Sequence, residues 1–157
     1  MTEKQFWMKL DQLAGQRMKI PEFVQVLRQG YEEDLGIPIA CHHEGPDRVS
    51  QMYQTVDKEH PNRDGNRYMI CYTSRELADS DPMASEHWEK VPVRAVIDNA
   101  LAKPVIGGFV FNLQSDKKFT LIPKQFLGTP VEVSQAVKDL VTKWENEGDN
   151  RFIVYKN

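Results

Sequence analysis

The chain has 157 residues, of which 20 are basic and 23 acidic, giving a formal net charge of −3. This length suits one domain with a single buried core, and the composition is that of a soluble globular protein, not a disordered, collagen-like or coiled-coil chain. The slightly acidic balance argues against a nucleic-acid-binding protein. No apolar run is long enough to cross a bilayer, and charges near the N-terminus argue against an export signal. We therefore expect a cytoplasmic protein that does not use a membrane.

Two cysteines, Cys41 and Cys71, are too few for a disulfide framework. A chain of this length can build a hydrophobic core without covalent cross-links. We therefore expect both cysteines to be free thiols in a reducing compartment.

Two helices are predicted at the N-terminus. Thr2 and Gln5 have the spacing of a capping box, and the following apolar residues recur at helical intervals until Gly15, which can end the helix: Phe6, Leu10 and Leu13. A second helix is expected to begin at Pro21, where the missing N–H costs nothing. Its inward residues are expected to be Phe23, Val24 and Leu27, and Gly30 is expected to stop or bend it.

The middle of the chain predicts a loop followed by a hairpin. Gly and Pro residues punctuate Gly36–Arg48, which indicates a loop with a short extended piece at Ile37–Ala40. Val49–Val56 and Arg67–Tyr72 are both predicted strands. The polar segment between them contains Asp64-Gly65, a strong turn signal, so the two strands are expected to pair.

A short helix and a longer one are expected next. Thr73, with Glu76 three residues later, is expected to cap the short helix. The polar connection that follows is expected to contain a helical turn around Trp88. Pro92 then opens a helix that Pro104 closes, with one apolar stripe formed by Val93, Val96, Ile97, Ala100 and Leu101.

Val105–Asn112 and Lys118–Ile122 predict a second strand pair, with Phe119 and Leu121 on one face of the later strand. The adjacent Gly107 and Gly108 lack the spacing of a phosphate-binding loop. They indicate a bulge or a close approach of another element. A helical turn is predicted at Pro123–Leu127.

The last helix is predicted at Thr129–Glu147, and a short strand follows at Phe152–Tyr155. The helix has a capping box and an apolar stripe of Val133, Val137, Leu140 and Trp144, which we expect to pack on the sheet that contains Val105–Phe111. Strands and helices are interspersed without strict alternation. We therefore predict a single α+β domain over residues 1–157, with a central, mostly antiparallel or mixed sheet of about five strands and flanking helices.

Cys41, His42, His43 and Glu44 are four potential metal ligands in succession. Zinc ligands are usually separated by two to four residues so that their side chains converge. Adjacent residues lack that spacing, so we expect no metal and predict that the purified protein holds no stoichiometric zinc. No other cofactor is indicated by the sequence.

An alternative hypothesis is an enzyme of unknown class that uses the Cys41–Glu44 loop with a distant histidine, His60 or His87. Neither cysteine is surrounded by a nucleophile signature, and Cys71 lies within a strand pattern that favours a buried thiol. The sequence therefore assigns no catalytic, cofactor-binding or metal-binding residue. A non-catalytic function is favoured over an enzymatic one.

Tryptophans give the remaining indication of a binding function. Trp144 lies on the apolar stripe of the last predicted helix, so we expect it in the core. Trp7 lies off the stripe of the first helix, and Trp88 lies in a polar connection. Because exposed tryptophans often anchor protein partners, these two residues are candidates for such a role.

Residues 67–127 resemble the SseB N-terminal-domain family, the bacterial enhanced serine sensitivity proteins. Three segments carry the resemblance: the strand and capped helix RYMICYTSREL at Arg67–Leu77, the Pro-started helix VPVRAVIDNAL at Val91–Leu101, and GGFVFNLQSDKKFTLIPKQFL at Gly107–Leu127. The resemblance implies an α+β bacterial cytoplasmic domain. It supplies no catalytic residue, so we expect a protein-interaction or regulatory module whose partner is another protein. The sequence leaves the oligomeric state open.

Overall fold

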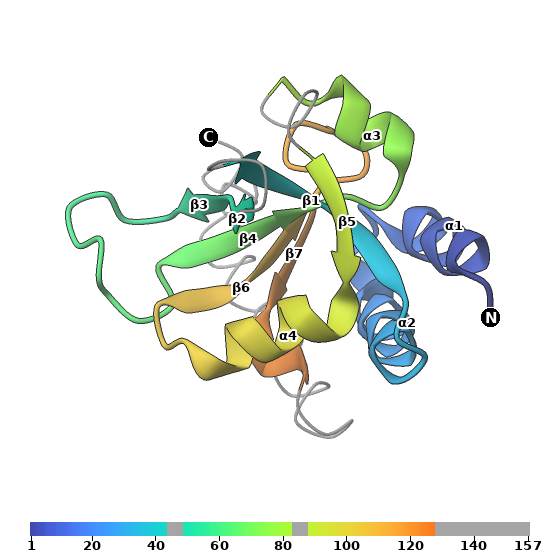
Figure 1. Cartoon of the computed structure of the whole chain (residues 1–157), viewed down its shortest axis with the longest axis horizontal. Coiled ribbons are helices and arrows are strands. Elements are labelled where there is room, and N and C mark those ends of the chain that lie inside the picture. The colour runs from blue at the N-terminus through green and yellow to red at the C-terminus, as the bar shows by residue number, and fades with distance from the viewer. Residues whose placement is uncertain (44–48, 83–87, 128–157) are drawn as a thin grey trace.

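A computed structural model describes residues 1–43, 49–82 and 88–127 of the chain. These residues form one α+β domain with a mixed sheet, as predicted from the sequence (Figure 1). The strands are β1 (Gly36–His43), β2 (Val49–Gln51), β3 (Tyr53–Thr55), β4 (Arg67–Cys71), β5 (Trp88–Pro92), β6 (Ile106–Phe111) and β7 (Thr120–Pro123). The helices are α1 (Glu3–Leu13), α2 (Ile20–Glu32), α3 (Arg75–Ser80) and α4 (Val93–Ala102), with short 3-10 helices η1 at Arg17–Lys19 and η2 at Lys124–Leu127.

The sheet has seven strands within the described ranges, more than the five or so expected. Its main order is β2-β1-β4-β6-β7, while β3 pairs with β4 and β5 pairs with β1. The β4–β6 pair is parallel and every other pair is antiparallel. The predicted hairpin and the predicted second strand pair are confirmed as β3–β4 and β6–β7.

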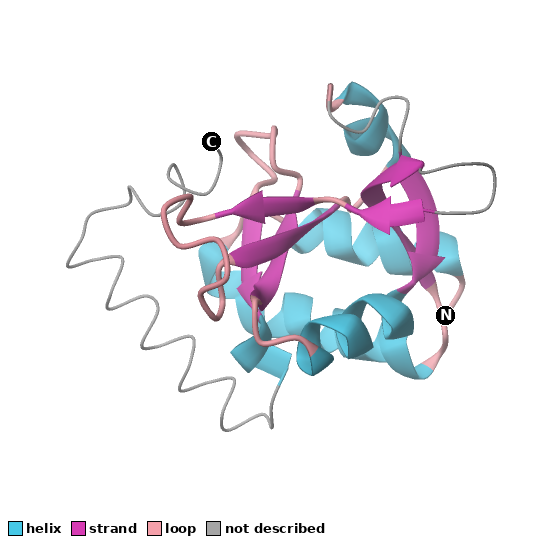
Figure 2. Ribbon diagram, turned by 60° about the vertical axis from the view of Figure 1, so that its left-hand side comes forward, coloured by secondary structure: helices cyan, strands magenta, loops and turns pink. Residues whose placement is uncertain are grey.

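The three longest of the described helices, α1, α2 and α4, pack together against one face of the sheet (Figure 2). Helix α2 contacts both α1 and α4. It reaches the sheet through Phe23, whose ring meets that of Phe111 edge-on with centroids 5.0 Å apart. Such an edge-to-face pair adds to the burial of both rings. The buried hydrophobic residues form one continuous cluster around this contact.

The start of the chain confirms the predicted capping box. Thr2 Oγ1 accepts from the backbone N–H of Gln5, and the Gln5 side chain accepts from the N–H of Thr2. Gly30 does not stop the helix, which was one of the two roles predicted for it, because α2 continues past it to Glu32. Gly30 lies inside the helix against the ring of Phe6 from α1, so its lack of a side chain serves helix packing and not helix termination.

The loop predicted over Gly36–Arg48 is wrong for Gly36–His43, which form strand β1, whereas the short extended piece predicted at Ile37–Ala40 is confirmed within that strand. This strand lies between β5 and the β4–β2 side of the sheet. Proline usually avoids such a position because it lacks a donor. The Pro38 carbonyl still accepts from the Tyr72 N–H at 3.0 Å, so part of the ladder is kept.

Trp88 begins strand β5, where a helical turn was expected. The strand pairs with β1 over five residues, from Ala40 opposite Trp88 to Gly36 opposite Pro92. The predicted strand at Val49–Val56 is interrupted at Met52 and forms β2 and β3. These differences arise because the strands pair with residues that are distant in sequence, and local sequence patterns do not predict such partners.

Two details of the predicted helices also differ. Ser74 caps α3 by accepting from the Leu77 N–H, in place of Thr73. Leu101 was placed on the apolar stripe of α4, but its side chain is 57% exposed. The other four members of that stripe are buried, as predicted: Val93, Val96, Ile97 and Ala100.

The glycine pair in β6 marks a close approach and an irregular register, as predicted. A Cβ at Gly107 would lie 2.5 Å from the carbonyl oxygen of Gly65. Gly108 has a φ of +155°, and a Cβ there would lie 2.2 Å from the carbonyl oxygen of Ile122. The β4–β6 register shifts between Arg67 and Tyr68, beside this pair. Only glycine fits both positions.

The predicted helix at Thr129–Glu147, with Trp144, and the predicted strand at Phe152–Tyr155 lie outside the described residues. The helical turn predicted at Pro123–Leu127 is confirmed as η2. Among the described helices, none combines the length and apolar character needed to span a membrane.

Candidate functional site

A groove of about 740 Å³ lies between α1, the start of α3 and strand β5. Figure 1 labels these three elements. One face of α1 lines it, from Glu3 to Asp11. The turn and first residues of α3, Thr73–Glu76, form a second wall, and Trp88–Lys90 of β5 form the third. The groove is thus assembled from three segments that are far apart in sequence.

Two half-buried tryptophans flank the groove, and both indole N–H groups are already used within the protein. Trp7 Nε1 donates to the Gly36 carbonyl at 2.7 Å, and Trp88 Nε1 donates to Asp79 Oδ1 at 2.7 Å. The guanidinium of Arg75 lies 5.6 Å from the centre of the Trp88 ring system. The rings are therefore held in place, and what they offer to the groove is apolar surface.

Strand β5 contributes an unpaired backbone edge within the described part of the chain. The carbonyls of Pro38 and Ala40 accept hydrogen bonds from the backbone N–H groups of Tyr72 and Met52, respectively. These bonds lie on the side of β1 away from β5. The backbone N–H and C=O groups of successive residues point to alternate sides of a strand. The backbone groups of Ile37 and Ile39 therefore point toward β5, where these residues pair with Val91 and Glu89. The backbone groups of the intervening residues, Trp88 and Lys90, therefore point away from β1.

The groove runs along this edge and not over one face of the sheet. Successive residues of a strand point to opposite faces, yet Trp88, Glu89 and Lys90 all line the groove. Only the edge of a strand is shared by three consecutive residues. The outward-pointing backbone groups of Trp88 and Lys90 therefore belong to the strand edge that lines the groove.

Charges of both signs surround the groove. Lys90 Nζ lies 3.0 Å from Glu3 Oε1, so an ion pair connects α1 with β5. The other carboxylate oxygen of Glu3 accepts from the Gly36 N–H at 3.0 Å. Lys4, Arg75, Glu76 and Glu89 add further charges of each sign to the lining. This balance favours a ligand that carries both apolar groups and dipoles over a polyanion.

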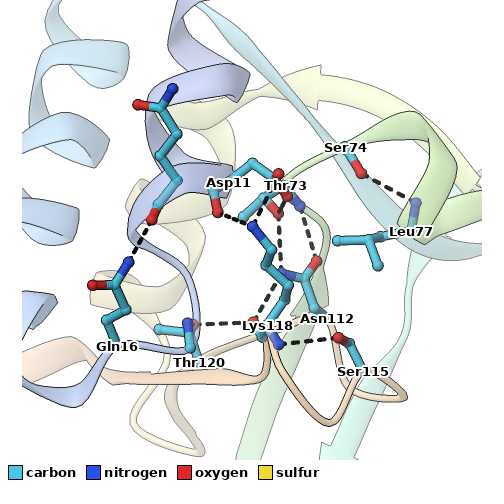
Figure 3. Close-up of polar contacts among 11 residues, drawn as sticks. Asp11, Gln16, Thr73, Ser74, Leu77, Asn112, Ser115, Lys118 and Thr120 are labelled. Atoms are coloured by element: carbon cyan, nitrogen blue, oxygen red, sulfur yellow. Dashed lines mark hydrogen bonds and ion pairs between the residues drawn. The ribbon is translucent and has the colours of Figure 1, made fainter.

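A buried polar network supports the inner end of the groove (Figure 3). Asn112 lies just after β6 with a φ of +58° and is 1% exposed. Its Oδ1 accepts from the Thr73 N–H, and its Nδ2 donates to Thr73 Oγ1 and to the Lys118 carbonyl, each at 3.0 Å. One side chain thus joins the turn before α3 to the turn between β6 and β7.

The same network fixes the end of α1. Asp11 Oδ1 accepts from Thr73 Oγ1 at 2.8 Å, and Lys118 Nζ lies 3.2 Å from Asp11 Oδ2 (Figure 3). The Gly15 N–H donates to Thr120 Oγ1 at 2.7 Å. Because buried, satisfied polar networks favour one arrangement of the groups they join, the walls of the groove are held at a defined separation.

The residues singled out as potential metal ligands or catalytic groups are not brought together in the described structure. Cys41 and His42 are neighbours in β1, so their side chains leave opposite faces of the strand. Cys41 is buried, whereas His42 is exposed. His43 pairs with Val49, and Glu44 and His87 lie outside the described residues.

His60 lies in the long loop between β3 and β4 and serves a local contact. Its Nδ1 is 2.9 Å from Asp57 Oδ2, and Arg63 Nη1 is 3.1 Å from the same oxygen. The hydrogen bond with His60 lowers the pKa of Asp57 below its ordinary value. No group of three metal-binding side chains occurs within residues 1–43, 49–82 and 88–127.

Both cysteines are buried free thiols. Burial raises the pKa of the Cys41 thiol, and it raises that of Cys71, which is 0% exposed, far more strongly. A catalytic thiol needs the opposite shift, because the thiolate is the nucleophile. The arrangement around these two side chains is therefore that of small hydrophobic core residues.

Sequence reasoning identified Trp7 and Trp88 as candidate anchors but did not place them together. The groove also depends on the β5 edge, which was predicted as a polar connection, and on Asn112, whose role required its tertiary partners. A turn residue with a polar side chain after a buried strand was the only local signal for Asn112.

Comparison with known proteins places this chain in a family. Searches of curated proteins and of solved structures gave no significant match. The family model for the SseB protein N-terminal domain matches residues 9–126. That range covers most of the chain and includes α2, α3, α4 and all seven described strands. The chain therefore belongs to the SseB N-terminal domain family.

Proposed function

We propose that this domain is a non-catalytic protein-interaction module of the bacterial cytoplasm, and that the groove between α1, α3 and β5 receives an extended segment of a partner protein. The proposal rests on the edge of β5 beside Trp7 and Trp88, which no strand of the described residues pairs with. Outward-pointing backbone groups on a strand edge are best satisfied by another extended chain.

The geometry limits how the partner would bind. Pro92 ends β5 and has no N–H, so the added segment would pair only with the backbone of Trp88 and Lys90. Affinity would then depend on side chains packed against the indole rings and against Met8, which is 50% exposed. Aromatic and Met side chains are frequent in such anchoring contacts.

The enzymatic alternative has less support. Catalysis by a thiol and a histidine requires the two groups within hydrogen-bond reach in a concave site. Cys41 and Cys71 are buried with raised thiol pKa values, and His60 is paired with Asp57 in an exposed loop. The favoured partner is accordingly another protein, not a small substrate or a nucleic acid.

The proposal can be tested with a photo-crosslinking amino acid placed at Met8 of the full-length chain in its source cells. The matched control is the same amino acid at Met18, which is 80% exposed and does not line the groove. We expect a discrete crosslinked protein from position 8 that is absent from position 18. Identical adducts from both positions would contradict a specific groove.

Two backbone variants test strand addition itself. Lys90→Pro removes the outward N–H, whereas Lys90→Ala removes the ion pair with Glu3 but keeps that N–H. We expect the position-8 adduct to be lost with proline and kept with alanine. If Lys90→Pro fails to fold, Trp88→Ala replaces it, and an undiminished adduct in that variant would overturn the proposal.

A further inference from the structure

A second cavity, separate from the groove, lies where helix α2, helix α4 and η2 meet, and its volume is about 260 Å³. Helix α2 contacts both α4 and η2 (Figure 1). Lys124 Nζ of η2 donates to the carbonyls of Ala100 and Lys103 at the end of α4, each at 3.2 Å. The cavity is therefore bounded by elements that are joined to one another. Its lining shares no residue with that of the groove and consists of Arg28, Tyr31, Glu32, Ile97, Leu101 and Leu127.

Part of this lining is aliphatic. Ile97 is buried, Leu127 is half-buried, and Leu101 is 57% exposed. Among the described residues, the exposed large hydrophobic side chains are Met8, Met18 and Leu101, and of these Leu101 lines the cavity. Apolar surface in a concave site favours a ligand that displaces water from it. The cavity therefore suits a ligand with a hydrocarbon part.

The guanidinium of Arg28 brings a positive charge to the same lining, and its donors are barely used. Its Nη2 donates to the Phe126 carbonyl at 3.4 Å, which is longer than a usual hydrogen bond. Its Nε is buried and has no hydrogen-bond partner within the described residues. A guanidinium has five N–H donors, and donors that are removed from water without an acceptor are costly. This half-buried side chain therefore lacks an acceptor that a ligand could supply.

The neighbouring charges leave Arg28 as the place where an anion is favoured. The hydroxyl of Tyr31 donates to Asp98 Oδ1 at 2.7 Å. Arg94 donates to the Tyr31 carbonyl at 3.0 Å and lies 5.2 Å from the centre of its ring, so both charges are engaged with Tyr31. Glu32 follows Arg28 by one helical turn and is exposed, and its carboxylate repels an anion at its own end of the cavity. An anionic group is thus directed to the guanidinium.

We propose that this cavity binds a small aliphatic carboxylate, with the carboxylate on Arg28 and the hydrocarbon part against Leu101 and Leu127. A guanidinium binds a carboxylate through two parallel N–H···O bonds, which makes this anion the best match for Arg28. The volume lies just below the range of about 300–1,000 Å³ that is typical of small-molecule sites. A short or medium-length chain therefore fits better than a nucleotide or a long-chain lipid. This inference is independent of the groove and of the function proposed for it.

NMR titration of the full-length protein with octanoate at neutral pH tests the site, and 1-octanol is the matched neutral probe. We expect octanoate to shift the backbone signals of Tyr31, Leu101 and Leu127 and to leave those of Trp7 and Trp88 in the groove unchanged. Octanol should bind about tenfold more weakly, because it cannot form the charge-assisted pair. Equal affinity for the two probes, shifts confined to the groove, or the absence of a saturable shift would overturn the proposal.

Variants of the lining give a second test. Arg28→Gln should weaken octanoate binding by about tenfold or more. The matched control is Arg63→Gln in the β3–β4 loop, which should leave the affinity unchanged. If Arg28→Gln does not fold, Leu101→Glu replaces it, because this exposed position tolerates a charge that would repel the carboxylate. Its control is Ala102→Glu, at an exposed neighbour outside the lining. Binding should be lost with Leu101→Glu and kept with Ala102→Glu, and an unchanged affinity in Arg28→Gln or Leu101→Glu would refute the site.

Discussion

Replacing Gly30 by alanine is expected to destabilise the domain, although alanine is the better helix former. A Cβ at position 30 would lie 2.5 Å from Cζ and 2.7 Å from Cε1 of Phe6. Carbon atoms normally approach to about 3.5–4.0 Å, so the ring would have to move by about 1 Å. Phe6 is 0% exposed and packed on all sides, so α1 would have to move with it.

The magnitude follows from two opposing terms. Alanine in place of glycine in a helix gains about 1 kcal/mol. Overpacking of a buried position costs about 1–3 kcal/mol, and an overlap of this size at a fully buried ring belongs in the upper part of that range. We therefore expect the free energy of unfolding to fall by about 1–2 kcal/mol.

Urea unfolding of purified variants measures this effect. The control is Gln25→Ala, at an exposed position of the same helix, which should change stability by less than about 0.5 kcal/mol. Phe6→Leu should cost less in the Gly30→Ala background than in wild type, because the smaller side chain relieves the overlap. A higher urea midpoint for Gly30→Ala would refute the packing argument.

Three further predictions concern buried polar groups. Asn112→Gly should lower the free energy of unfolding by about 2–4 kcal/mol through the loss of three hydrogen bonds, two of them buried. Asn112→Ala should cost about 1 kcal/mol more, because φ is +58° at this position. Urea melts of both variants measure the two effects. Burial and the hydrogen bond to Asp81 raise the pKa of Tyr72 above its ordinary value of 10.0, so this phenol stabilises the fold below pH 10, and the contribution is lost above pH 10 as the unfolded chain ionises. Tyr72→Phe should therefore show a weaker decline of the urea midpoint above pH 10 than wild type does. An equal decline would contradict this role of Tyr72. Cys41 and Cys71 should resist an aromatic disulfide reagent in the native protein and react in urea, and rapid labelling of native Cys41 would argue against its burial.

The elements predicted correctly are those determined by nearby residues. The capping box at Thr2 and Gln5 determines where α1 begins, and the Asp64-Gly65 turn supports the β3–β4 hairpin. The strand pair β6–β7 has a short polar connection and a clear apolar pattern. In each case the residues that form the element lie within about 16 positions of one another, so local patterns were sufficient.

The elements predicted incorrectly depend on distant partners. A proline such as Pro38 usually indicates a loop, yet its carbonyl accepts a hydrogen bond from the Tyr72 N–H within the sheet. Thr73 has the right spacing to cap α3, but its hydroxyl is bonded to Asp11 and Asn112, which leaves the cap to Ser74. The groove could not be predicted for the same reason, since its three walls become neighbours only after the chain has folded.

The contacts that fix the end of α1 have a consequence for protein synthesis. Gly15 bonds to Thr120 across 105 positions, and Asp11 contacts Lys118 across 107. A ribosome must therefore complete β7 before the first helix can reach its final position. Closing so long a loop is entropically costly, and folds rich in distant contacts form slowly. While translation continues, α1 can already contact α2, Gly36 and Lys90, but the end of the helix at Asp11 and Gly15 lacks its partners Lys118 and Thr120.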